Sequence, residues 1–187
     1  MSLLDTILNN LPEVKAPKEQ KLSFATKLKW TLIILILYYI LSSIPLAGLG
    51  NNALETFEFL SVILGAEFGS IISLGIGPIV TASIVLQLLN GSGIVKFDLT
   101  SHEGKRRFQG IQKILAFFFI IFEAIIYVYM GGLTPAEGFS PWFLSLQLTI
   151  GGLMIMFFDE VVSKWGFGSG ISLFIAAGVS KTLFIRA

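Results

Sequence analysis

The sequence predicts an all-α polytopic membrane protein that crosses the bilayer five times. Of its 187 residues, 54% are apolar and only 13% are charged, far outside the averages of soluble proteins. The uncharged run Gly69 to Asn90 is long enough to span a membrane, because about 20 apolar residues cross a hydrocarbon core of roughly 30 Å. Four further apolar stretches are separated from it by polar or glycine-rich connections.

Residues 1–29 form a polar, lysine-rich segment before the first span. Its first eleven residues predict an amphipathic helix that lies on the membrane surface or docks against the protein's own loops. A start of this length is atypical of a cleaved signal peptide, so the first span is expected to be permanent. Residues 30–187 hold the spans, which we expect at Trp30 to about Leu49, Gly69 to Asn90, Ile114 to Met130, Trp142 to Phe158 and Ile171 to Ile185.

The second span is interrupted by the sequence Gly75-Ile76-Gly77-Pro78. Proline removes a backbone donor and glycine weakens a helix, so an unbroken helix is not expected here. In a membrane, the freed backbone groups must find partners inside the protein or in a water-filled cavity. This span is therefore predicted to line something other than lipid.

Lysine and arginine residues gather on one side of the predicted topology. Five precede the first span, five lie between the second and third spans, and Lys164 lies between the fourth and fifth. The opposite side holds only Lys181 and Arg186. Because basic connections remain in the cytoplasm, the N-terminus is predicted to be cytoplasmic.

The connection after the first span contains a short predicted helix, residues 52–64. About 13 residues rise roughly 20 Å, which is too short for a crossing. The two carboxylates Glu55 and Glu58 also argue against burial in lipid. The helix is predicted either to re-enter a cavity from the outer side or to lie flat on the outer surface.

Enzyme chemistry has little support in the sequence. There is no cysteine and only one histidine, which excludes a disulfide framework and a multi-histidine metal centre. Asp159 and Glu160 are adjacent, and neighbours in sequence do not face each other on a helix. We interpret them as a solvated helix end, and no cofactor is expected.

Several motifs resemble the SecY family of protein-conducting channels, closest to its archaeal members. The second span carries Gly75-Ile76-Gly77-Pro78-Ile79-Val80-Thr81-Ala82, and the third opens with Gln109-Gly110-Ile111-Gln112-Lys113. Further matches follow in order at 159–164 and at 166–180. The resemblance implies a channel built from two inverted halves of five spans each, of which this chain is similar to the first half.

The resemblance also implies roles for individual residues. The family's pore constriction is a ring of branched aliphatic side chains, which by motif match receives Ile76, Val80, Ile171 and Ile175. Its lateral gate receives Thr81 and Glu123. Its plug, which rests beneath the ring, receives the helix at about 52–64, with residues Asn52, Leu54, Glu55, Phe57, Glu58, Leu60 and Leu64.

The partners that the resemblance implies are the second half of the channel, a SecE-like single-span subunit and a small Sec beta or SecG-like subunit. A ribosome, signal peptides, nascent polypeptides and membrane lipid complete the set. The implied location is the plasma membrane. Two alternatives stay open: one repeat of a secondary transporter with broken helices, and a purely structural membrane subunit.

Overall fold

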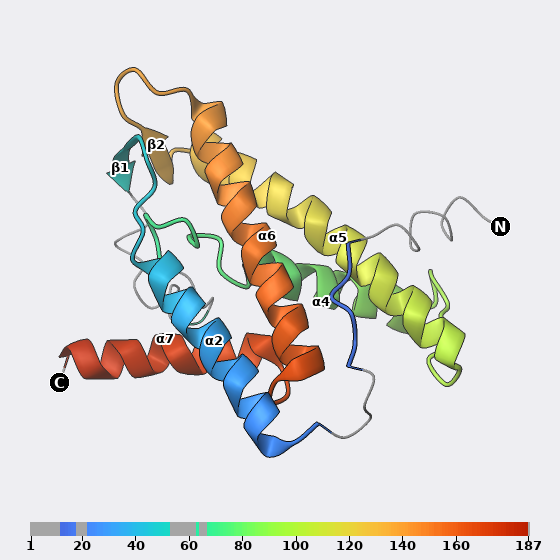
Figure 1. Ribbon diagram of the computed structural model, residues 1–187. Coiled ribbons are helices and arrows are strands. Elements are labelled where there is room, and N and C mark those ends of the chain that lie inside the picture. Colours follow the sequence, from blue (N-terminus) through green and yellow to red (C-terminus); the bar gives the residue numbers. More distant parts are fainter. Residues whose placement is uncertain (1–11, 18–21, 53–62, 64–66, 187) are drawn as a thin grey trace.

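The structure is a computed structural model that describes residues 12–17, 22–52, 63 and 67–186. Over these residues the chain forms a bundle of helices with a small antiparallel sheet at one end (Figure 1). The elements in chain order are α2 (Phe24–Ser42), β1 (Leu49–Asn52), α4 (Gly77–Gly91), α5 (His102–Tyr129), β2 (Leu133–Pro135), α6 (Pro141–Trp165) and α7 (Gly170–Arg186). The predicted amphipathic helix of residues 1–11 lies outside the described residues.

Three helices, α2, α5 and α6, are long and apolar enough to cross a membrane. The apolar helices α4 and α7 are shorter, with 15 and 17 residues. The serine hydroxyls of Ser23, Ser101 and Ser140 each accept a backbone N–H at a helix start, which fixes the beginnings of α2, α5 and α6. The five predicted helical segments are therefore confirmed as helices.

The predicted boundaries of the spans were less accurate than their number. Helix α2 ends at Ser42 rather than near Leu49, because Ser43, Pro45 and Gly48 lead the chain into turns. Helix α5 begins at His102, well before Ile114, since hydropathy does not detect the charged helical turns that precede the apolar stretch. Helix α6 likewise continues past Phe158 to Trp165.

The second predicted span is only partly helical. Residues 71–76 form successive turns, and α4 begins at Gly77 with Pro78 in its first turn. Proline suits this position because the first turn has no intrahelical acceptor for its missing N–H. We call residues 67–76 the turn segment. The sequence correctly located the interruption, but it is a helix start rather than a kink within a helix.

A two-stranded antiparallel sheet was not predicted from the sequence. Strand β1 pairs with β2, which follows α5, and Leu49 lies opposite Pro135. The strands are short, with four and three residues, so a pattern of alternating residues could not reveal them. Asn52, which was expected to begin the plug helix, instead ends β1.

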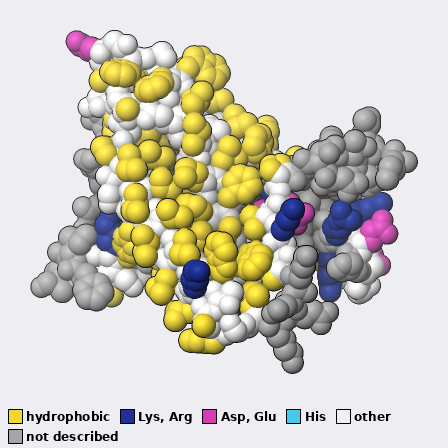
Figure 2. All heavy atoms as spheres, viewed as in Figure 1, with side chains coloured by type: hydrophobic (Ala, Val, Ile, Leu, Met, Phe, Trp, Pro, Cys, Tyr) yellow, Lys and Arg dark blue, Asp and Glu magenta, His cyan; other side chains and the backbone are white. Residues whose placement is uncertain are grey.

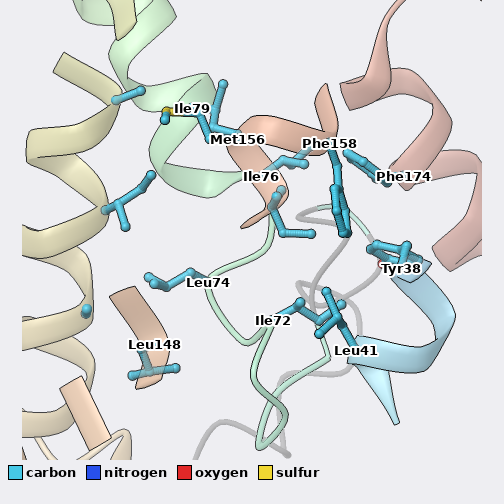
Figure 3. Close-up of a cluster of buried hydrophobic side chains, with 14 of the residues drawn as sticks. Tyr38, Leu41, Ile72, Leu74, Ile76, Ile79, Leu148, Met156, Phe158 and Phe174 are labelled. Atoms are coloured by element: carbon cyan, nitrogen blue, oxygen red, sulfur yellow. The ribbon is translucent and has the colours of Figure 1, made fainter. Parts of the chain in front are cut away.

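The buried core lies where α2, the turn segment and helices α4 to α7 meet. Figure 3 shows side chains from α2, the turn segment, α4, α6 and α7 in one cluster, among them Tyr38, Ile72, Ile79, Met156 and Phe174. Outside this core, hydrophobic side chains cover the face over α2 and α6, with charged groups toward its edges (Figure 2). Such an apolar exterior is expected of helices that face lipid.

Candidate functional site

The first pair of candidate ring residues lies where the turn segment becomes α4. Ile76 is the residue just before α4, and its carbonyl oxygen accepts the Val80 N–H at 3.0 Å, so both occupy one helical turn. Ile76 is 2% exposed and belongs to the core cluster, whereas Val80 is partly buried against it. Figure 3 places Ile76 in the same cluster as Met156 and Phe158 of α6.

The second pair lies at the start of α7. Ile171 and Ile175 are one helical turn apart and are both partly buried against the same core cluster. Phe174, between them in sequence, is fully buried and stacks on Tyr38 of α2 at a ring-centroid distance of 5.1 Å. The structure therefore brings the four residues to one cluster from two helix starts.

The two candidate gate residues lie together between α4 and α5. The Thr81 hydroxyl lies 3.5 Å from Glu123 Oε1 and donates to the Gly77 carbonyl oxygen at 2.9 Å. A hydroxyl has one proton, and 3.5 Å is long for a hydrogen bond, so the contact with Glu123 is a weak one. A second polar contact on this interface joins Gln112 Nε2 to Ser83 Oγ at 2.6 Å. A partly buried carboxyl group within a span is a functional candidate by default.

The turn segment is held by small polar side chains. The Ser73 hydroxyl accepts the Gly69 N–H at 2.9 Å and donates to the Ser70 carbonyl oxygen at 2.6 Å. The Ile71 N–H donates to the Ile44 carbonyl oxygen at 3.0 Å, and the Leu46 N–H donates to that of Gly69 at 2.8 Å. The irregular backbone thus finds its partners inside the protein, as the membrane requires.

Gly151 of α6 lets the turn segment approach closely. A Cβ atom at this position would overlap the carbonyl oxygen of Ile71. At the neighbouring Gly152, a Cβ would lie 2.8 Å from Ile120 Cγ2 of α5. The sequence did not lead us to expect the close approach at these glycines or the serine hydrogen bonds of the turn segment. Small and hydroxyl residues inside apolar stretches are the pattern that could have indicated them.

The interpretation of Asp159 and Glu160 as a solvated helix end was wrong. Asp159 Oδ1 accepts the Ile171 N–H of α7 at 3.0 Å. Glu160 has a side-chain exposure of only 15% and forms ion pairs with Lys113 at 2.8 Å and Lys164 at 2.9 Å. The two carboxyl groups do act separately, as expected of neighbours on a helix.

Residues 12–17, which we call the N-terminal strap, dock on this charged cluster. The Val14 N–H donates to Glu160 Oε1 at 3.2 Å, and its carbonyl oxygen accepts Lys164 Nζ at 2.6 Å. Glu13 pairs with Lys164 at 2.6 Å, which lowers the pKa of the Glu13 carboxyl group below its usual value. Nothing in the sequence pattern predicted this docking.

Most of the predicted plug lies outside the described residues. This applies to Leu54, Glu55, Phe57, Glu58, Leu60 and Leu64. The flanks of this region are described: β1 pairs with β2 before it, and Glu67 forms an ion pair with Lys181 of α7 at 2.9 Å after it.

Comparisons with known proteins agree with this architecture. The SecY family model matches residues 70–187, and a model for the plug domain of Sec61p matches residues 36–69. The chain is 55% identical to the protein translocase subunit SecY of Methanothermobacter thermautotrophicus over 98% of its length, which covers 40% of that relative. It is 45% identical to the SecY subunit of Pyrococcus furiosus over 94% of its length, covering 38% of the relative.

Solved structures give the same result. The chain superposes with a TM-score of 0.88 and 41% identity on the structure of a protein conducting channel, with 100% of this chain and 43% of that chain covered. Sec61 in a canine ribosome-channel complex gives the same TM-score, identity and coverage. The chain thus spans about 40% of the length of the curated relatives it matches. With the family model covering residues 70–187, this chain belongs to the SecY family.

Proposed function

We propose that this chain forms one half of a protein-conducting channel, which passes unfolded polypeptides across a membrane and releases transmembrane segments sideways into lipid. The observation that carries the proposal is the match in fold, with a TM-score of 0.88 over the whole chain to a protein conducting channel. The ring motifs of that family fall on two helix starts that share one buried cluster.

In this proposal Ile76, Val80, Ile171 and Ile175 form half of the constriction. Branched aliphatic side chains exclude hydrated ions by dewetting, yet they offer few hydrogen bonds to a passing polypeptide. Thr81 and Glu123 belong to the lateral gate, and the region at 52–64 acts as the plug. The complementary half of the channel supplies the rest of the ring and the other wall of the gate.

The proposed partners are a SecE-like subunit, a small Sec beta or SecG-like subunit and a ribosome. The relative in the canine ribosome-channel complex supports the last of these. The proposed location is the plasma membrane with the N-terminus in the cytoplasm. The orientation is supported by the placement of lysine and arginine, and two aromatic pairs support a bundle that reaches both membrane interfaces: Trp30 with Trp165 at one end, and Tyr129 with Trp142 at the other.

The test of the channel is conductance and transport with and without the constriction. Replacing Ile76 and Ile171 with glycine in the reconstituted complex is expected to admit ions in the resting state, while a secretory precursor is still transported. The single-channel conductance without substrate is the measurement. A double variant that is as tight as the parent would show that these residues only pack, and a parent complex that transports no precursor would refute the channel itself.

Orientation has its own test. The chain has no cysteine of its own, so single cysteines can be placed at the exposed positions Lys105 and Glu137. In the proposed topology they are expected to react with a membrane-impermeant reagent from opposite sides of the membrane. Reaction of both from the same side would contradict the topology.

A further inference from the structure

We infer that Asp159 is a positioning residue for the pore constriction: its carboxyl group fixes the first turn of α7 and thereby the location of Ile171. The inference rests on the proposed function, since it concerns the placement of a proposed ring residue. Asp159 itself is on α6 and lines no pore in this proposal.

The geometry at the start of α7 is specific. The Asp159 Oδ1 atom accepts the backbone N–H of Ile171 at 3.0 Å. The first N–H groups of a helix have no partner within the helix, and a carboxyl group there is also favoured by the helix dipole. This bond to Asp159 is directional, and together with the close approach of Gly170 to the Asp159 backbone it constrains the position of the first turn.

Gly170 is the second half of this contact. A Cβ atom at residue 170 would lie 2.6 Å from the Asp159 Cα atom and 2.7 Å from Oδ1. Helix α7 therefore starts directly against the backbone of α6. A larger residue at 170 would collide with the Asp159 backbone and carboxyl group and push the start of α7 away from α6.

The turn between α6 and α7 has a further anchor on α2. The Phe167 N–H donates to the Thr31 hydroxyl at 3.2 Å, and the Gly166 N–H donates to the Val162 carbonyl oxygen at 2.8 Å. Thr31 is itself tied to the carbonyl oxygen of Lys27 at 2.9 Å. The chain entering α7 is thus fixed before it reaches the Asp159 contact.

Beyond its first turn, α7 is held mainly by apolar packing and by contacts near its middle and outer end. Phe174 stacks on Tyr38, and the Tyr39 hydroxyl donates to the Ala177 carbonyl oxygen at 3.1 Å. Lys181 pairs with Glu67 at 2.9 Å. These contacts hold α7 from its middle outward, and the directional bond to Asp159 fixes the first turn, which carries Ile171.

The adjacent Glu160 provides a matched control. It is a carboxylate on the same helix and in the same partly buried setting, and it forms ion pairs with Lys113 and Lys164. Among the described residues, the Glu160 side chain bonds to α5, α6 and the N-terminal strap. Loss of Glu160 therefore reduces stability without releasing α7.

The experiment measures the position of α7 and the seal together. Nitroxide labels on cysteines at the exposed positions Ile150 of α6 and Ser172 of α7 report the distance between the helices by electron resonance, in the channel complex reconstituted in lipid vesicles. Asp159→Ala is expected to shift and broaden the distance distribution and to raise the resting ion conductance several-fold. Asp159→Asn keeps an acceptor oxygen and is expected to restore the parent distance. Glu160→Gln is expected to leave both readouts unchanged.

An Asp159→Ala variant with the parent distance and the parent conductance would overturn the inference, as would an equal effect of Glu160→Gln. Should Asp159→Ala fail to assemble, Asp159→Glu decides, because it keeps the charge but moves the acceptor oxygen by one methylene: a parent-like distance in that variant would overturn the inference, and a displaced α7 would support it. A parent complex that transports no precursor refutes the proposed channel, whereas the label distances still report whether Asp159 positions α7.

Discussion

Two segments of this molecule are fixed in place without belonging to a helix, and they are fixed in opposite ways. Apart from the ion pair of Glu67 with Lys181 at its start, the turn segment, residues 67–76, is bound by backbone groups and by serine hydroxyls, and Ile72, Ser73 and Leu74 in it have no exposed surface. The N-terminal strap, residues 12–17, is bound through charged side chains on a surface that is partly exposed.

The difference follows from the surroundings of each segment. In an apolar interior, water cannot replace a lost partner, so irregular backbone needs a complete set of short, neutral hydrogen bonds and close packing. At a polar surface, water and salt compete with each contact, and several charged groups must act together to hold a segment. The turn segment should therefore be sensitive to sterics, and the strap to charge, salt and pH.

The largest expected effect comes from Gly151→Ala, because the added Cβ would collide with the Ile71 carbonyl oxygen. Overpacking of this kind costs about 1–3 kcal/mol, and a backbone neighbour has little room to yield. We expect a clear fall in the thermal unfolding midpoint of the complex in detergent. Gly91→Ala is the control, since a Cβ there meets nothing within 4 Å. Equal midpoints for both variants would show that the turn segment is not tightly packed.

The next effect is expected for Ser73→Ala, which removes a fully buried hydroxyl. The Gly69 N–H and the Ser70 carbonyl oxygen would each lose a partner, at a cost of about 1–3 kcal/mol. The exposed Ser92, whose hydroxyl donates to the Leu89 carbonyl oxygen, serves as the control, and its replacement by alanine should cost far less. The midpoint of unfolding again decides, and it should not depend on salt.

A smaller effect is expected for Glu160→Gln, which removes two ion pairs and weakens the contact with Val14. Partly exposed pairs contribute on the order of 1 kcal/mol. The strap should detach, and Trp165 reports this because its indole N–H donates to the Lys15 carbonyl oxygen at 2.9 Å. A shift of tryptophan emission in the variant, reproduced in the parent by high salt, is the expected result. Unchanged emission in both cases would mean that packing rather than charge holds the strap.

The smallest effect is a pH dependence from Glu13. Its pKa is lowered in the folded protein by the hydrogen bond from Lys164, so its stabilisation is present above the unfolded pKa. That contribution is lost as the pH falls from the usual glutamate range through the lowered pKa. We expect the emission of Trp165 to change in this acidic window for the parent and less for Glu13→Gln. Identical acid titrations of the two proteins would contradict the assignment.

The sequence predicted the parts of this structure that depend on composition and hydropathy. Uncharged runs located the helices, and Gly77-Pro78 located the interruption before α4. The motif resemblance assigned Thr81 and Glu123 to the same gate. These residues are far apart in the chain, and the structure places them in contact. These features are local in sequence or carried by recognisable motifs.

The features that were missed depend on contacts between distant residues. The capping of α7 by Asp159, the strap on Glu160 and the pairing of β1 with β2 each join segments that no periodicity connects. Glu160 looks like any solvated carboxylate until Lys113, far from it in sequence, is placed beside it. Hydropathy also does not detect that α5 begins with charged helical turns before its apolar stretch, because those turns are helical but polar.

The length of α5 has a structural consequence. Its 28 residues rise about 42 Å, which exceeds a hydrocarbon core of roughly 30 Å by about two turns. These extra turns carry Lys105, Arg106 and Arg107, and the helix contains no proline that could act as a joint. At its other end α5 reaches Tyr129, and the chain continues into β2, which pairs with β1, the strand that leads into the proposed plug. One continuous helix thus joins a charged end on one side of the membrane to the strand pair on the other.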